Sequence, residues 1–226
     1  MLVFGRNVAK EILNSNLKVK KVYLQKDFRD QEILNLLNLK NIIYLDKSDM
    51  NKKVLGNHQG IILDVLDYKY FNLSDILNED TIVMLDHIED PHNFGAIIRT
   101  CEAAGIRAII IPKDRGVTVN STVFKVSVGT CERVKIVMVT NLVNTLKELK
   151  NNGFWVIGTD MNGTDYRNLD YSSKTILVIG NEGKGIGNLV RKNCDFVASI
   201  PMYGKVNSLN ASVAAGIMIY EVIRRK

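Results

Sequence analysis

Residues 175–187 read Thr-Ile-Leu-Val-Ile-Gly-Asn-Glu-Gly-Lys-Gly-Ile-Gly, an apolar run that opens into a glycine-rich loop. The run has the length of a buried strand, and the pattern after it predicts a short helix near 187–193. Four glycines within residues 180–187 allow the backbone to turn tightly and to approach a ligand closely. In α/β proteins, a strand, such a loop and a helix in this order place sites at strand carboxyl ends.

Two further polar segments follow apolar runs in the same way. Residues 90–100, Asp-Pro-His-Asn-Phe-Gly-Ala-Ile-Ile-Arg-Thr, come shortly after the apolar residues 82–85. Near the C-terminus, Ile-Pro-Met-Tyr-Gly at 200–204 is followed by Asn-Ser-Leu-Asn-Ala-Ser at 207–212. The three segments together narrow the function far more than any one of them, and we expect them to supply one site.

From residue 76 onward, apolar runs without polar alternation are separated by helical patterns, which favours a parallel sheet covered on both faces. The expected strands are 82–85, 108–111, 134–139, 154–158, 175–179 and 196–200. The expected helices lie near 94–104, 120–126, 141–151, 187–193 and 209–224.

The first 67 residues predict a separate, small α/β domain. Its expected helices are 8–13, 31–39 and 49–55, and its expected strands are 21–24, 41–45 and 60–65. The pattern breaks at 68–75, where Tyr-Lys-Tyr-Phe-Asn-Leu-Ser-Asp reads as a linker whose aromatic residues could pack between domains. The expected domains are therefore 1–67 and 76–226, joined by residues 68–75.

Composition excludes several classes of protein. The 226 residues carry a net charge of +6 without a basic tail, which fits a polyanionic partner but does not require one. Three widely spaced cysteines suggest buried thiols in a reducing compartment, and the three scattered histidines form no metal-ligand pattern. No signal peptide or membrane span is evident, so a cytoplasmic protein without a metal is expected.

Individual residues in the first two polar segments admit two interpretations each. Asn93 is a candidate N-cap for the helix that follows. Arg99 is either a surface salt-bridge partner or a clamp for a phosphate. Glu182 would repel a phosphate and suits a ligand with positive charge or hydroxyl groups, although the loop could also be a simple turn and cap.

The third segment places Ser208 and Asn210 at the start of a long amphipathic helix. N-capping by Asn207 or Ser208 would account for part of this pattern. It leaves Asn210 unexplained, because a second polar residue there has poor helix propensity.

These segments resemble motifs 1, 2 and 3 of the SpoU (TrmH) family of RNA ribose 2′-O-methyltransferases. The matching stretches are 93–100, 180–185, 200–202 and 208–212, and the similarity continues at 153–158 and 58–60. The N-terminal residues 4–8, Phe-Gly-Arg-Asn-Val, resemble the ribosomal-protein-like RNA-binding domain of the RlmB branch. That branch modifies a guanosine of large-subunit ribosomal RNA.

The resemblance implies a homodimer whose catalytic domain contains a deep trefoil knot, a feature that chain-threading rules would not predict. It also implies S-adenosylmethionine (AdoMet) as the methyl donor, held by Gly180, Ile200 and Leu209 with Met202 nearby. For the attack of a ribose 2′-oxygen on the methyl group, Arg99 is the implied key residue. The implied assisting residues are Asn93, Glu182, Ser208 and Asn210.

A guanidinium group is very hard to deprotonate, so anchoring a phosphate and stabilising oxyanion charge suit Arg99 better than general base catalysis. Glu182 is expected either to orient Arg99 or to face the cationic end of AdoMet, with Ser208 and Asn210 positioning the ribose. Three alternatives stay open: the same reaction on transfer RNA, a non-catalytic RNA-binding protein, and, more remotely, a nucleotide-binding oxidoreductase.

Overall fold

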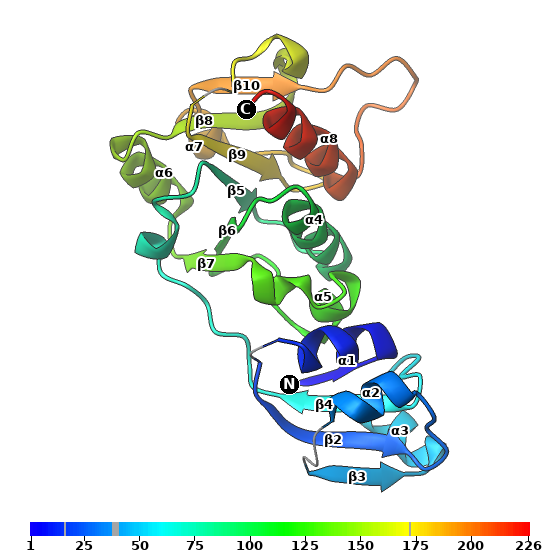
Figure 1. Ribbon diagram of the computed structural model, residues 1–226. Helices are drawn as coiled ribbons and strands as arrows, with labels where there is room; N and C mark the ends of the chain where they lie inside the picture. The colour runs from blue at the N-terminus through cyan, green and yellow to red at the C-terminus, as the bar shows by residue number, and fades with distance from the viewer. Residues whose placement is uncertain (16, 38–40, 172) are drawn as a thin grey trace. The chain divides into compact units, whose positions relative to one another are not determined.

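The computed structural model describes residues 1–15, 17–37, 41–171 and 173–226 (Figure 1). Its contacts divide the chain into two compact units, residues 1–69 with 119–132, and residues 70–118 with 133–226. The domain limits inferred from the sequence, 1–67 and 76–226, stay a prediction.

The first unit contains a four-stranded mixed sheet in the order β1-β4-β2-β3. Strand β4 pairs antiparallel with β1 and β2, and β2 pairs parallel with β3. The elements of residues 1–69 are β1 (Leu2–Phe4), α1 (Arg6–Leu13), β2 (Val19–Gln25), α2 (Gln31–Leu36), β3 (Ile42–Leu45), α3 (Lys47–Lys53) and β4 (Ile61–Val65). The sequence did not predict β1, which is too short to show a period. The last two residues of the expected helix 31–39 lie outside the described residues.

The segment 119–132 contributes α5 (Ser121–Val126) to the first unit, followed by the 3-10 helix η2 (Thr130–Arg133). The aromatic residues of the expected linker pack within single units. Tyr68 lies edge-on to Phe124, with ring centroids 6.5 Å apart. Phe71 forms a parallel bridge with Val137.

The second unit is built on a six-stranded sheet in the order β10-β8-β9-β5-β6-β7, with every pairing parallel. Its strands are β5 (Thr81–Asp86), β6 (Ala108–Pro112), β7 (Lys135–Val139), β8 (Trp155–Asp165), β9 (Thr175–Gly180) and β10 (Phe196–Ser199). Its helices are α4 (Pro91–Ala103), α6 (Leu142–Asn151), α7 (Asn188–Arg191) and α8 (Ala211–Arg224), with short 3-10 helices η1 (Leu73–Ile76) and η3 (Tyr166–Asn168).

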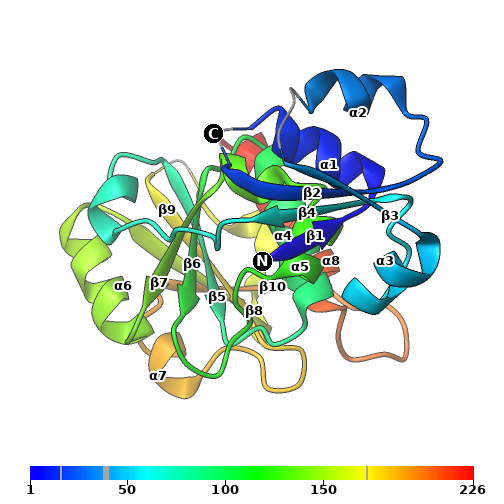
Figure 2. The ribbon, with the colours of Figure 1, turned by 90° about the horizontal axis from the view of Figure 1, so that it is seen from below.

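Helices cover both faces of this sheet, as Figures 1 and 2 show, with α6 and α7 on one face and α4 and α8 on the other. Alternate residues of β5 illustrate the division. Ile82 and Met84 belong to the core cluster that includes Leu146 of α6 and Val190 of α7. Since the strand is buried on both faces, its sequence shows no polar alternation. The expected α/β class with a covered parallel sheet is confirmed.

Strand β8 is longer than predicted and continues from Gly158 to Asp165. Its second half, Thr-Asp-Met-Asn-Gly-Thr-Asp at 159–165, is polar and therefore gave no strand signal. A register shift between Val197 and Ala198 allows β10 to pair with both halves. The path of the chain through the expected trefoil knot stays a prediction.

The parallel arrangement brings the three polar segments to one edge of the sheet. Strands β5 and β9 are neighbours that end in register, with Asp86 opposite Gly180. Strand β10 ends at Ser199 on the far side of β8. The loops that leave these strands at their carboxyl ends carry the residues predicted to form the site.

Truncating a core side chain of α6 should destabilise the second unit. Leu146 is fully buried, so Leu146→Ala should reduce the free energy of unfolding by about 2–5 kcal/mol through lost burial and a cavity. Urea unfolding followed by the fluorescence of Trp155, the single tryptophan, measures this loss in the second unit. Lys147→Ala, on the same helix but exposed, should change the value by less than about 0.5 kcal/mol. Equal effects would contradict the packing of α6.

Candidate active site

The loop after β9 is closed by a backbone bridge between Asn181 and Gly185. The Gly185 amide donates to the Asn181 carbonyl at 2.9 Å, and the Asn181 amide donates back at 3.1 Å. Gly180 is buried beneath this turn, where a Cβ atom would lie 2.3 Å from the Gly185 carbonyl carbon. The close approach of two backbone segments therefore requires glycine at 180.

A buried carboxylate ties this loop to the end of β5. Asp86 is 2% exposed, and its Oδ2 accepts from the Gly187 amide at 2.6 Å. Its Oδ1 lies 2.5 Å from His87 Nδ1. The Asn181 side chain donates to the His87 carbonyl at 2.9 Å, which adds a second tie. The sequence analysis missed Asp86, although an acidic residue that ends an otherwise apolar strand was the available signal.

Asn93 links the three polar segments through its side-chain amide. Its Nδ2 donates to Glu182 Oε1 at 2.6 Å, and its Oδ1 accepts from Asn210 Nδ2 at 2.9 Å. Asn93 itself is 7% exposed, while its partners Glu182 and Asn210 are exposed, so both bonds are partly shielded from water. Since each amide atom has one partner of the right polarity, the orientation of the group is fixed. The structure thus joins three of the five residues predicted to take part in catalysis.

Two helix starts differ from the predictions. Asp90, not Asn93, caps α4, with its Oδ1 accepting from the His92 amide at 2.9 Å. Asn93 therefore lies inside the first turn, and its side chain is available to Glu182. Asn210 caps α8, accepting from the amides of Ser212 and Val213 at 2.9 and 3.3 Å. The proposed caps at Asn207 and Ser208 were wrong, and capping accounts for Asn210.

Arg99 lies on the exposed side of α4, six residues after Asn93. Within the described ranges, its guanidinium group makes no hydrogen bond or ion pair, so all its donors are available to a ligand. Glu182 contacts Asn93 instead, and the suggested orientation of Arg99 by Glu182 is not seen.

The other predicted site residues lie at the same edge. Ser208 is exposed in the long connection between β10 and α8 (Figure 1). Ile200, Met202 and Leu209 are half-buried in this connection, while Gly180 is buried at the end of β9. These residues offer an apolar surface and backbone groups rather than charged side chains.

The cysteines behave as the sequence analysis predicted. All three are free, and Cys101 and Cys131 are buried. Burial raises the pKa of Cys194 to about 11 and that of Cys131 to about 12, so these thiols stay protonated at neutral pH. Among the described residues, no cluster of His, Cys, Asp and Glu could hold a metal ion.

Two protein-family models match the chain. The SpoU rRNA Methylase family matches residues 80–220, and the family described as RNA 2′-O ribose methyltransferase substrate binding matches residues 2–71. The chain belongs to the SpoU family. The family and the enzyme class expected from the sequence, an RNA 2′-O-ribose methyltransferase, are thereby confirmed.

Two relatives of this SpoU protein align over nearly its full length, and a third aligns over about two thirds of it. YacO of Bacillus subtilis, assigned to the TrmH family of tRNA/rRNA methyltransferases, is 42% identical over 99% of this chain and 95% of its own. An AdoMet-bound rRNA methyltransferase from Sinorhizobium meliloti superposes with a TM-score of 0.83 and 26% identity, covering 99% and 86% of the two chains. A TrmH/SpoU tRNA-modifying enzyme of A. aeolicus has a TM-score of 0.60 and 36% identity, covering 68% and 80%.

In the part of this SpoU protein that the structure describes, no helix combines the length and apolar character needed to cross a membrane.

Adding one methyl group at position 180 should disrupt the loop that follows β9. Gly180→Ala should reduce the free energy of unfolding by about 1–3 kcal/mol, because the new Cβ would overlap the Gly185 backbone. Gly183→Ala is the matched control, since its Cβ would meet nothing nearer than Asn181 Oδ1 at 3.6 Å. Chemical denaturation of both variants checks the difference. Unchanged stability in Gly180→Ala would show that the loop is not closed as described.

Proposed function

We propose that this protein transfers a methyl group from AdoMet to the ribose 2′-hydroxyl of a guanosine in large-subunit ribosomal RNA. The observation that carries the proposal is the hydrogen-bonded chain from Glu182 through Asn93 to Asn210. It joins three loops at one sheet edge and leaves Arg99 without a protein partner in the described ranges. The proposal also places the protein in the cytoplasm, where ribosomal RNA is found.

The cofactor fits the residues at this edge of the sheet. Gly180, Ile200, Met202 and Leu209 would hold AdoMet, since they supply a glycine turn and half-buried apolar side chains. When bound, AdoMet supplies an electrophilic methyl group on a positively charged sulfur. Only one oxygen of Glu182 is bonded to Asn93, which leaves the second for a ligand amino or hydroxyl group.

Arg99 carries the main catalytic role in this proposal. Its permanently charged, planar guanidinium group binds the phosphate beside the target nucleotide through paired N–H donors. The same charge stabilises the ribose oxygen as its proton leaves. Because it makes no protein bond in the described ranges, no existing interaction has to be broken when RNA arrives.

The remaining predicted residues position the ribose. Asn93 and Asn210 hold the amide chain in one orientation, and Asn210 also fixes the first turn of α8. Ser208 lies two residues before this cap and presents its hydroxyl group to the solvent side. Residues fixed by packing and second bonds lose little entropy when a substrate binds, which favours a defined attack geometry.

Transfer RNA is the second candidate substrate. The A. aeolicus relative, whose name states tRNA modification, is 36% identical but covers 68% of this chain. The Sinorhizobium rRNA methyltransferase aligns with 99% of this chain. The aligned part includes residues 2–71, which match the substrate-binding family. The presence of that region favours ribosomal RNA.

A homodimer formed through the catalytic domain completes the proposal. Helix α8 exposes apolar side chains at helical spacing, with Val213 51%, Tyr220 53% and Ile223 36% exposed. These residues form one stripe on a helix whose opposite face packs against α4 and the sheet. In a two-fold symmetric dimer, this stripe would pack against the same stripe of a second copy, because such an interface uses one surface of both subunits.

Replacing Arg99 should abolish methyl transfer without weakening AdoMet binding. Arg99→Ala should lower kcat/KM at least about 100-fold, because the charge on the attacking oxygen loses its stabilisation. Arg99→Lys should also be impaired, since lysine cannot form paired bonds to a phosphate. Radiolabelled methyl transfer to unmodified ribosomal RNA and, separately, to unmodified tRNA measures the rates and identifies the substrate.

Arg107→Ala is the matched control, because Arg107 is exposed and precedes β6 at the opposite edge of the sheet. Its activity should stay within about twofold of the unmodified protein. Full activity in Arg99→Lys would remove both roles given to the arginine. Radiolabelled methyl found in tRNA alone would make tRNA the substrate. AdoMet binding without methyl transfer to either RNA would favour a non-catalytic RNA-binding protein.

Charge placed on the α8 stripe should separate the proposed dimer. Light scattering should give about twice the chain mass of 25.4 kDa for the unmodified protein and the single mass for Val213→Asp/Tyr220→Asp. An unpaired carboxylate in an apolar interface costs several kcal/mol of association free energy. Leu189→Asp, at a residue 68% exposed on α7, should leave the mass unchanged. A double variant that stays dimeric would place the interface elsewhere.

A further inference from the structure

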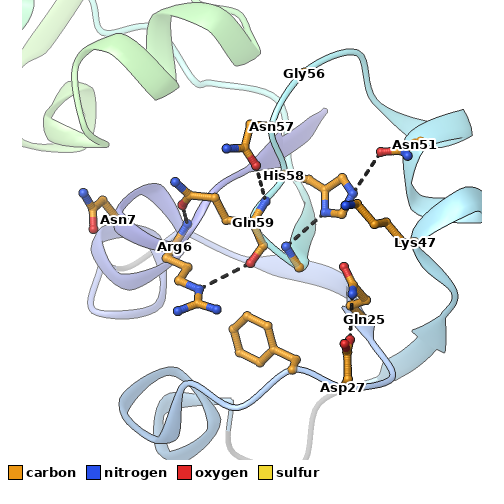
Figure 3. Close-up of a pocket in the computed structure, with 12 residues that line it drawn as sticks. Arg6, Asn7, Gln25, Asp27, Lys47, Asn51, Gly56, Asn57, His58 and Gln59 are labelled. Atoms are coloured by element: carbon orange, nitrogen blue, oxygen red, sulfur yellow. Dashed lines mark hydrogen bonds between the residues drawn. The ribbon is translucent and has the colours of Figure 1, made fainter.

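A polar pocket of about 680 Å³ lies within the first unit (Figure 3), whereas the residues assigned to methyl transfer all belong to the second unit. It is formed by the start of α1, the end of β2 with the turn that follows it, one side of α3 and the loop before β4. A cavity of this size matches sites for small molecules or single nucleotides. Two of the short sequence similarities, at 4–8 and 58–60, contribute residues to it.

His58 fixes the loop that forms one wall of the pocket. It is 4% exposed, and its Nδ1 accepts from the Gly60 amide at 3.0 Å. The ring proton therefore lies on Nε2, which donates to Asn51 Oδ1 at 3.1 Å. Burial, and secondarily the charge of Lys47, lowers the pKa of His58, so the ring is neutral at physiological pH. With its oxygen occupied, the Asn51 amide has N–H donors left for a ligand.

The Arg6 guanidinium group lies over the Phe28 ring beside this loop. The Arg6 guanidinium carbon lies 5.3 Å from the centre of the Phe28 ring. Gln59 accepts two hydrogen bonds from Arg6. Its side-chain oxygen accepts from the Arg6 backbone amide at 2.7 Å, and its backbone carbonyl accepts from Arg6 Nε at 3.4 Å. Gly60 cannot carry a side chain here, since a Cβ would lie 2.8 Å from the Phe28 ring. A guanidinium plane and an aromatic ring are the surfaces on which proteins stack unpaired bases.

The charges and amides of the pocket suit a nucleotide. Arg6 forms an ion pair with Asp30 at 3.8 Å, so the positive charge available to a phosphate is that of Lys47, which makes no ion pair within the described ranges. Asp27 accepts from the Gln25 amide at 2.6 Å, which leaves the Gln25 oxygen as an acceptor. Side-chain amides with free donors and acceptors read the edges of bases, and a lysine binds a phosphate.

We propose that this pocket binds one unpaired nucleotide of the RNA substrate, with the base against Arg6 and Phe28 and a phosphate at Lys47. The inference deepens the proposed function and rests on it for the identity of the RNA. Arg6, Lys47 and Asn57 are exposed at the rim, so a polynucleotide chain can enter and leave. Leu55, 96% exposed in the same loop, offers an apolar contact to a neighbouring base.

The test measures RNA affinity of the full chain without AdoMet, so that it does not depend on methyl transfer. The probes are two RNA hairpins of equal length, one fully paired and one with a single bulged nucleotide, the latter also made with 2-aminopurine at the bulge. The unmodified protein should bind the bulged hairpin more tightly, and 2-aminopurine fluorescence should fall as the base stacks. Arg6→Ala and Lys47→Ala should each weaken binding of the bulged hairpin on the order of tenfold.

Arg29→Ala and Lys52→Ala are matched controls, because both residues are exposed, close in sequence and outside the pocket. Their affinity for the bulged hairpin should stay within about twofold. Arg6→Ala should also lose the preference for the bulge and the fluorescence change, while its thermal midpoint and AdoMet affinity stay unchanged.

Three results would overturn the proposal. Equal binding of both hairpins by the unmodified protein would exclude recognition of an unpaired nucleotide. Equal losses for both hairpins in Arg6→Ala would reduce the site to general electrostatic attraction. Displacement of the RNA by guanosine monophosphate at equal concentration would indicate a site for free nucleotides. Failure of methyl transfer to ribosomal RNA, with the hairpin results as expected, would contradict only the substrate assignment.

Discussion

The candidate active site at the carboxyl ends of the strands depends on the side-chain amide of Asn93. One planar group connects the loop after β9, through Glu182, to the start of α8, through Asn210. These segments lie 89 and 117 residues away along the chain, so the two bonds close long loops. An amide can do this because it donates and accepts at once, whereas a carboxylate at the same position could not donate to Glu182. The donor and acceptor directions of these hydrogen bonds also decide which polar groups stay available to a ligand.

A different set of contacts holds the backbone beneath these hydrogen-bonded side chains. Asp86 binds the Gly187 amide, Asn181 binds the His87 carbonyl, and Gly180 lies against the Gly185 backbone. These contacts fix the loop from both ends, so the backbone at Glu182 is held where its side chain reaches Asn93. A site built in this way combines a rigid glycine turn with a few convergent polar groups, as ligand sites on parallel sheets do.

The sequence predicted the class of the second unit because a buried parallel sheet has an unmistakable pattern of apolar runs. It also predicted that the three polar segments would supply one site. The pattern could not identify the caps, since Asp90 and Asn93 are both good N-cap residues and only tertiary contacts choose between them. The polar half of β8 was missed because it shows no apolar pattern and is fixed by its pairing with β10, and Asp86 was missed because its partner, the Gly187 amide, lies 101 residues away along the chain. The residues alone left Arg99 as either a surface salt-bridge partner or a phosphate clamp, and the family resemblance made it the key residue of the predicted site.

On the proposed function, the two units divide the work of recognising RNA. The candidate active site offers the Arg99 guanidinium group, which has no partner among the described residues, and the hydrogen-bonded amides of Asn93 and Asn210. These groups can place a ribose and a phosphate but cannot distinguish one nucleotide sequence from another. The pocket of the first unit adds a stacking surface and several amides, which are the groups that read an unpaired base. Selectivity for one ribose among thousands therefore requires both sites on the same RNA. Since binding at the two sites is linked through one chain, modest affinities at each combine into a specific complex.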